Sequence, residues 1–137
     1  MKIERNFTAA GQDAYAALTF KSTTSEIRNP DGTIVFKLEN CEIPDGWSQV
    51  ASDVIAQKYF RKAGVPSELK KLKEKGVPEF LWRSEPADGA TMSGETSAKQ
   101  VFDRLAGAWT YWGWKGGYFS TEEDARSYFD EMRYMLA

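Results

Sequence analysis

Hydrophobic and polar residues alternate over residues 34–39, which is the period of a β-strand with one buried face. Positions 34, 36 and 38 of this stretch are all large and hydrophobic. Residues 29–32 (NPDG) come just before it and favour a tight turn, because proline fixes φ and glycine tolerates a positive φ. Strand-like residues at 23–28 supply a first arm. The pattern predicts a β-hairpin, which follows an extended lead-in over residues 1–20.

The hydrophobic spacing changes to that of an α-helix after the turn-forming residues 44–46 (PDG). Hydrophobic side chains then recur every three or four positions from about Ser48, a favourable N-cap residue, to Lys62. Gly64 and Pro66 stop this pattern. We therefore predict a helix over residues 48–62.

Residues 68–75 (ELKKLKEK) are predicted to form a short charged helix on the surface. Ser67 can cap its start, and Gly76 and Pro78 can close its end. Lysines alternate with glutamates along it, so we interpret its face as solvated rather than as a phosphate site. Residues 83–94 (RSEPADGATMSG) are rich in turn-forming residues and are predicted to be a mobile loop, the only candidate linker.

Two longer hydrophobic stripes complete the chain. The first begins at Thr96 and ends at Gly113 or at Gly116-Gly117, and it predicts the central helix. The second begins behind Thr121, which with Asp124 resembles a capping box, and it continues to the last residues. Because this last stripe has no polar or glycine stop signal, we expect the chain to be part of a longer protein.

The order of these elements predicts an α+β fold that is mostly α-helical. An N-terminal β-hairpin is expected to lie on three to four helices, and the last two helices are expected to form an antiparallel pair. At 137 residues the chain has the length of one ordinary domain. We expect a single domain over residues 1–137, with an extended and β-hairpin part at 1–45 and a helical part at 46–137.

The charge and hydropathy of the chain exclude several classes of partner. Its 18 basic and 20 acidic residues are mixed and give a net charge of −2, so no strongly basic surface is expected to attract nucleic acid or anionic lipid. The chain has neither an N-terminal signal-peptide pattern nor a hydrophobic run long enough to cross a membrane. We expect a soluble, cytoplasmic protein that binds neither nucleic acid nor membrane.

The chain has one cysteine, Cys41, and no histidine. This composition excludes disulfides within the chain, most zinc sites and the nucleophiles that depend on histidine. Cys41 follows a predicted strand and is interpreted as a buried small hydrophobic residue. Neighbouring carboxylates such as Glu122 and Glu123 diverge by about 100° on a helix, so they do not converge on one substrate. We assign no catalytic, cofactor-binding or metal-binding residue.

Residues 109–119 (WTYWGWKGGYF) carry aromatic side chains on every side of a helix end, and one helix face cannot bury them all. Three interpretations stay open: core with partly exposed rings, a docking surface for another protein, or a base-stacking surface, the last weakened by the lack of a basic groove. The glycines here follow a helix and favour a C-cap rather than a phosphate loop. The candidate interface residues are Trp109, Trp112, Trp114, Tyr118, Phe119, Tyr128 and Met132.

Four runs of the sequence together resemble the opening segment of the long bacterial vitamin B12-dependent, or class II, ribonucleotide reductases. The runs are NPDGTIVFKLEN, PDGWSQVASDVIAQKYFRKAGVP, GETSAKQVFDRLAGAWTYWGWKGGYFS and EEDARSYFDEMRYMLA. The resemblance covers essentially the whole chain in order. It implies the N-terminal, non-catalytic domain of an oxidoreductase that converts ribonucleotides to deoxyribonucleotides for DNA synthesis and replication.

In that family, homolysis of the cobalt–carbon bond of adenosylcobalamin generates a thiyl radical on a cysteine. The radical abstracts the 3′ hydrogen of the ribose, and a cysteine pair supplies two electrons. The resemblance places these cysteines on a ten-stranded α/β barrel that follows the segment seen here. Cys41 corresponds to none of them, so we expect no catalysis and no cofactor in this segment alone.

The expected partner is the catalytic barrel of the same reductase, in cis or in trans. The aromatic residues and the apolar face of the last helix are the expected contact surface, which also allows a homo-oligomer. An alternative function is that of a free-standing accessory or regulatory module, which binds a reductase or another protein through the same aromatic residues.

Overall fold

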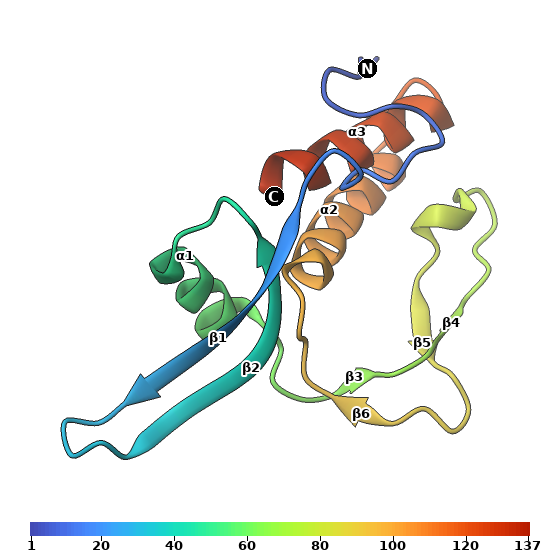
Figure 1. Cartoon of the computed structure of the whole chain (residues 1–137). Helices are drawn as coiled ribbons and strands as arrows, with labels where there is room; N and C mark the ends of the chain where they lie inside the picture. The colour runs from blue at the N-terminus through green and yellow to red at the C-terminus, as the bar shows by residue number, and fades with distance from the viewer.

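A long antiparallel hairpin forms the first part of the fold in the computed structural model, which describes residues 1–137. Strand β1 (Phe20–Arg28) pairs with β2 (Ile34–Pro44), and the hairpin projects away from the helices at its turn (Figure 1). The turn forms as predicted, because Gly32 has a φ of +87° and its N–H donates to the carbonyl of Asn29. No helix or strand precedes Phe20, but the lead-in is not extended throughout, because hydrogen-bonded turns form within residues 9–18.

The predicted helix over residues 48–62 is confirmed in position but ends earlier. Helix α1 (Gln49–Val54) starts at Ser48, whose side chain accepts a hydrogen bond from the N–H of Ala51 at 3.2 Å. It continues directly into a wider π-helical turn (Ile55–Tyr59). The N–H of Phe60 closes that turn on the carbonyl of Ile55 at 3.0 Å.

The two last helices form the predicted antiparallel pair (Figure 1). Helix α2 (Ala98–Lys115) begins at Ser97, which forms a capping box with Gln100. It ends at Gly116, and Gly117 adopts a φ of +72°, so the glycines act as a C-cap as predicted. Helix α3 (Glu122–Leu136) begins at Thr121.

The predicted helix over residues 68–75 does not form, and the predicted loop over residues 83–94 contains two short strands. Strand β4 (Leu69–Lys71) pairs with β5 (Ser84–Pro86), and β3 (Val65–Pro66) pairs with β6 (Met92–Ser93). A short 3-10 turn (Glu79–Leu81) lies between β4 and β5. Together these elements form an arm that extends from the helices (Figure 1). Instead of capping a helix, the side chain of Ser67 accepts a hydrogen bond from the N–H of Thr91 at 3.0 Å.

The fold is therefore α+β, but it is not mostly helical as the sequence predicted. Helices contain 34% of the residues and strands 23%, in three small antiparallel sheets. The difference comes from the arm, where a charged stretch expected to be a surface helix is a strand and the expected loop supplies its partner. A helix of eight residues has little stability of its own, so the cross-strand hydrogen bonds prevail.

The hydrophobic core lies where the hairpin, α1 and α2 meet. Its most completely buried members are Cys41 and Ile43 from β2, Ala56 from the π-helical turn and Ala98 from α2. The rings of Trp47 and Phe102 lie 5.8 Å apart and close one side of it. Burial of Cys41 confirms its interpretation as a small hydrophobic residue, and burial raises the pKa of its thiol.

Candidate functional site

The seven predicted interface residues lie on α2, on α3 and in the turn between them, and they differ in their contacts. We call them the aromatic surface. Trp112 and Tyr118 are mostly exposed, at 65% and 66% of their area. The other five are half-buried: Trp109, Trp114, Phe119, Tyr128 and Met132. The set is therefore neither wholly core nor wholly free surface.

Part of the aromatic stretch attaches the arm to α2. The indole of Trp114 donates to the carbonyl of Gly76 at 2.8 Å, and the hydroxyl of Tyr111 donates to the carboxylate of Glu74 at 2.8 Å. Lys115 also pairs with Glu74 at 3.2 Å. These side chains are occupied by internal contacts, so they position the arm rather than offer an open surface.

The ring of Phe119 packs closely against α2. Its ring lies 5.5 Å from the ring of Tyr128 on α3, and it fills the space where a side chain at Gly113 would lie. A Cβ atom at Gly113 would come within 2.7 Å of the Phe119 ring. Glycine therefore permits the loop between the two helices to fold back onto α2.

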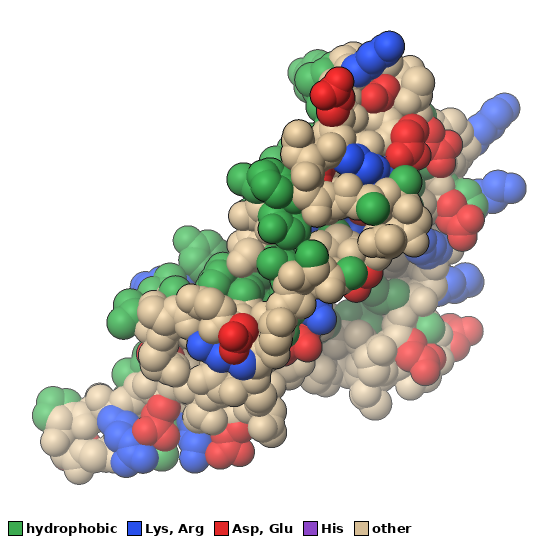
Figure 2. Space-filling model, turned by 45° about the horizontal axis from the view of Figure 1, so that its top comes forward, with side chains coloured by type: hydrophobic (Ala, Val, Ile, Leu, Met, Phe, Trp, Pro, Cys, Tyr) green, Lys and Arg blue, Asp and Glu red, His purple; other side chains and the backbone are tan.

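A second hydrophobic feature lies between α1 and α2, where sequence analysis assigned no site. An open groove of about 370 Å³ is lined only by hydrophobic side chains. We call it the apolar groove; its residues are Trp47, Ala51, Val54, Ile55, Tyr59, Val101, Phe102, Leu105 and Leu136. Figure 2 shows hydrophobic side chains gathered along one edge of the molecule, the side on which α1 and the end of α3 lie in Figure 1.

The end of α3 closes the apolar groove. Leu136 forms part of its wall, and the indole N–H of Trp47 donates to the carbonyl of Ala137 at 3.0 Å. The helical spacing of hydrophobic residues over 51–59 indicated a hydrophobic face here, but not that part of it would stay open. In the fold Val54 of α1 is 45% exposed, and Tyr59 of the π-helical turn is 57% exposed.

Opposite charges hold the N-terminal segment against α3. The buried carboxylate of Asp130 accepts hydrogen bonds from Arg5 at 2.8 Å, Arg126 at 3.1 Å and Arg133 at 2.7 Å. Burial disfavours the ionised carboxylate, but the bonds from Arg5 and Arg133 and the charge of Arg126 outweigh it and lower the pKa of Asp130. The Nε atoms of Arg5 and Arg133 are buried without a hydrogen-bond partner.

The carboxylate of Glu131 fastens the same segment further along. It accepts hydrogen bonds from the backbone N–H groups of Asn6 and Phe7 and from the hydroxyl of Thr8. Burial alone would raise the pKa of Glu131, but these hydrogen bonds outweigh it and lower that pKa. The ring of Phe7 stacks on that of Tyr134, with centroids 5.1 Å apart. One face of α3 is thereby covered by the chain's own first residues.

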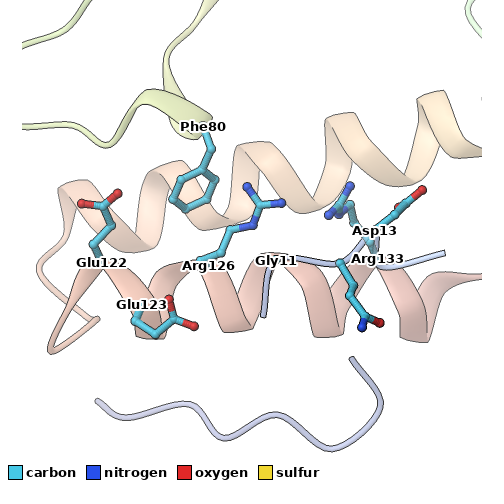
Figure 3. A pocket seen from close by; sticks show the side chains of 8 residues that line it. Gly11, Asp13, Phe80, Glu122, Glu123, Arg126 and Arg133 are labelled. Carbon is cyan, nitrogen blue, oxygen red and sulfur yellow. The ribbon is translucent and has the colours of Figure 1, made fainter. Parts of the chain in front are cut away.

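A polar pocket of about 690 Å³ lies between this segment, the arm and α3. Figure 3 shows Phe80 reaching from the arm towards Arg126, whose guanidinium lies 5.1 Å from the ring centroid. The pocket contains two arginines, Arg126 and Arg133, and both are paired with Asp130. Three carboxylates also line it: Asp13, Glu122 and Glu123. The guanidinium groups of Arg5, Arg126 and Arg133 are matched by the carboxylates of Asp130, Asp103 and Glu123, so the pocket has no excess positive charge for a phosphate group.

Groups that could hold a metal ion or act as a thiol nucleophile are few in this fold. No three histidine, cysteine or carboxylate side chains lie close enough together to hold a metal ion. The one thiol, at Cys41, is fully buried. No helix is both long and apolar enough to cross a membrane.

The chain matches known proteins over its whole length. Residues 21–137 match the family model described as class II vitamin B12-dependent ribonucleotide reductase. A vitamin B12-dependent ribonucleotide reductase of Bradyrhizobium diazoefficiens is 63% identical over the entire chain, and one of Agrobacterium fabrum is 57% identical. A reductase of the same name from Rhodopirellula baltica is 25% identical over 98% of the chain. The chain spans only 12%, 11% and 11% of the lengths of these three relatives.

Proposed function

Because the chain belongs to the class II vitamin B12-dependent ribonucleotide reductase family as its N-terminal domain, we propose that it is a single, non-catalytic docking domain of such an enzyme. Its role is to bind the catalytic part of the same polypeptide through the aromatic surface. The observation that carries this proposal is the exposure of Trp112 and Tyr118 at the end of the α2–α3 pair. Large exposed aromatic residues are enriched at protein interfaces and carry much of their binding energy.

The proposed activity of the whole enzyme is the reduction of ribonucleotides to deoxyribonucleotides, with cobalamin as the radical source. The residues of this chain do not fit that cofactor's chemistry. The reaction needs a radical cysteine and a reducing pair, whereas the one thiol here is completely buried. The polar pocket has its arginines paired with Asp130. We therefore place the cofactor and the reacting thiols in the remainder of the enzyme and derive no step through them here.

The lengths of the relatives favour docking in cis. In the reductases of Bradyrhizobium and Agrobacterium, sequence like this chain is about one eighth of a much longer polypeptide. Covalent linkage keeps a domain at high local concentration, so a modest surface is enough to hold it in place. A cytoplasmic location belongs to the same proposal. The free-standing accessory module remains the alternative and would use the same aromatic residues in trans.

The experiment uses the full-length reductase with a specific protease site placed after Ala137. After the folded enzyme is cleaved, size-exclusion chromatography at micromolar concentration tests whether the two parts elute together. We expect co-elution for the unchanged sequence and separation for a variant with Trp112→Ser and Tyr118→Ser. Separation of the unchanged parts would overturn the proposal.

A matched control variant replaces exposed residues at the other end of the molecule. Ile34→Ser with Val35→Ser removes two exposed hydrophobic side chains near the hairpin turn, far from the aromatic surface along the chain. This variant is expected to co-elute like the unchanged enzyme. If both variants separate equally, docking does not depend on the aromatic surface.

A further inference from the structure

We propose that the apolar groove binds an amphipathic helix from the part of the reductase polypeptide that follows this domain. The inference rests on the proposed docking function and adds a second contact, on a different face from the aromatic surface. The groove lies between α1 and α2 and is closed by the end of α3. It accepts large aliphatic or aromatic side chains and excludes charged ones.

The lining of the groove decides that the occupant is a helix. All nine lining residues are hydrophobic, and the indole N–H of Trp47 is already bonded to Ala137, so only the hydroxyl of Tyr59 could pair with a strand backbone. An extended segment would leave buried N–H and C=O groups without partners, which is costly. A helix satisfies its own backbone and needs only a hydrophobic stripe to fill such a groove.

The other covered face of the domain shows the contrast. Residues 6–8 bend over α3 without regular secondary structure, and there the carboxylate of Glu131 accepts hydrogen bonds from the backbone N–H groups of Asn6 and Phe7 and from the hydroxyl of Thr8. That face has a polar acceptor for the backbone of a non-helical segment. The apolar groove has no carboxylate of this kind.

The position of the groove identifies which polypeptide supplies the helix. Leu136 lines the groove, and Trp47 holds the carbonyl of Ala137 at its end. In the longer relatives this domain is only about one eighth of the chain. Because Leu136 and Ala137 lie at the groove, residues that follow them in such a polypeptide begin beside it. A helix in those residues needs only a short connection to fold back, and short connections are the common ones.

A second copy of this domain fits the groove less well. Its α2 and α3 contact each other, and of their large hydrophobic side chains only Trp112 and Met135, one on each helix, are mostly exposed. Its α1 is six residues long, too short to present a continuous hydrophobic stripe to a neighbour. The domain therefore lacks a free amphipathic helix of its own.

The test places a photo-crosslinking amino acid at Val54 in the full-length reductase and identifies the crosslinked peptide by mass spectrometry. We expect a crosslink within one polypeptide, to a segment with hydrophobic residues at helical spacing. Val50 lies one turn earlier on the same helix, is 73% exposed and does not line the groove, so it is the matched control. A crosslink between two copies, or equal yields from both positions, would overturn the inference.

A pair of substitutions gives an independent measurement. Val54→Glu places a charge at the rim of the groove, whereas Val50→Glu places the same charge outside it. In the enzyme cleaved after Ala137, we expect Val54→Glu to weaken association of the two parts about tenfold and Val50→Glu to leave it unchanged. Thermal unfolding of both variants is compared first, so that a folding defect is recognised.

The outcomes also separate this inference from the docking proposal. If the unchanged parts co-elute but Val54 neither crosslinks nor responds to substitution, the groove inference fails and docking through the aromatic surface stands. If the unchanged parts separate at micromolar concentration, the docking proposal fails, and the groove inference fails with it.

Discussion

The guanidinium of Arg5 donates to the carboxylate of Asp130 over 2.8 Å, although the two residues lie near opposite ends of the chain. The same carboxylate accepts hydrogen bonds from Arg126 and Arg133 on its own helix. One buried acid thus accepts hydrogen bonds from three guanidinium groups, and Glu123 and Asp103 supply further negative charge to Arg5 and Arg133. Asp130 joins the N-terminal segment to α3, and it fixes the side chains that surround the polar pocket.

Replacing Asp130 with asparagine should destabilise the domain strongly. The change keeps the size of the side chain but removes the negative charge that compensates Arg5 and Arg133, both of which are largely buried. Breaking a buried ion pair from one side typically costs several kcal/mol, so we expect the free energy of unfolding to fall by about 3 kcal/mol. Urea denaturation followed by circular dichroism measures it.

The control for this substitution is Glu122→Gln, which removes one negative charge from an exposed position on the same helix. Exposed charges contribute little, so a change within about 0.5 kcal/mol is expected. If the two substitutions have the same effect, the three arginines do not depend on Asp130.

Acid should release the N-terminal segment before the helices unfold. Hydrogen bonds from Ile3 and Thr121 lower the pKa of Asp124, and the pKa values of Asp130 and Glu131 are lowered by their bonds to the same segment despite burial. A carboxyl group with a lowered folded-state pKa contributes its stabilisation above the ordinary value of about 4. That stabilisation is lost as the pH falls below 4, towards the folded-state values.

NMR measures the release through the amide protons of Ile3, Asn6 and Phe7. Their protection factors, which correct the exchange rate for the intrinsic effect of pH, should fall as the pH drops below about 4, while that of Leu105 in α2 stays high. A simultaneous fall for all four would mean that the segment and the helices unfold together. Unchanged protection factors in acid would mean that the carboxylates do not hold the segment.

Local sequence signals were enough for the hairpin and the long helices. Residues 29–32 specify their turn by themselves, and Thr121 caps α3 through the N–H of Asp124 at 3.1 Å. The predicted capping box is nevertheless incomplete. One carboxylate oxygen of Asp124 accepts a hydrogen bond from the hydroxyl of Thr121 at 2.8 Å, but the other accepts the backbone N–H of Ile3 at 2.9 Å rather than that of Thr121. Ile3 is 121 residues away, and no pattern around Asp124 reveals it.

Non-local pairing explains the features that sequence analysis missed. Residues 69–71 have the composition of an exposed helix and become a strand only because Ser84–Pro86 lies beside them. The apolar groove likewise needs Trp47, Leu105 and Leu136 to meet from three parts of the chain. The aromatic stretch was recognised from sequence. Its division into exposed rings and rings that hold the arm depends on where Glu74 and Gly76 lie.

Cys41 should be chemically inert in the folded domain. The side chain is fully buried, and burial raises the pKa of its thiol, so little reactive thiolate is accessible. A thiol-specific chromogenic reagent should leave the native chain unmodified and react with one equivalent after denaturation. Cys41→Ala should leave turnover of the full-length reductase unchanged within about twofold, because nothing in the domain's chemistry uses this thiol. Complete loss of turnover in a variant that still folds would assign it a role.

Alanine at two glycines of α2 should have opposite effects. At Gly107 a Cβ atom would lie 3.8 Å from the nearest ring atom, of Phe129, which is ordinary contact. Gly107→Ala should therefore raise the free energy of unfolding by up to about 1 kcal/mol through helix propensity. At Gly113 the added atom would lie 2.7 Å from the ring of Phe119. The ring would have to move away from Tyr128, and the cost of this movement should outweigh the gain in helix propensity. We therefore expect the free energy of unfolding to fall by about 1–2 kcal/mol.

The cause of the Gly113 effect is tested by a double-mutant cycle with Phe119→Ala. Once the ring is absent, nothing occupies the position of the new Cβ atom, so Gly113→Ala should become as stabilising as Gly107→Ala. Urea denaturation of the four chains gives the coupling energy between positions 113 and 119. A coupling near zero would show that the ring moves aside without cost, and that the turn between α2 and α3 does not depend on glycine at this position.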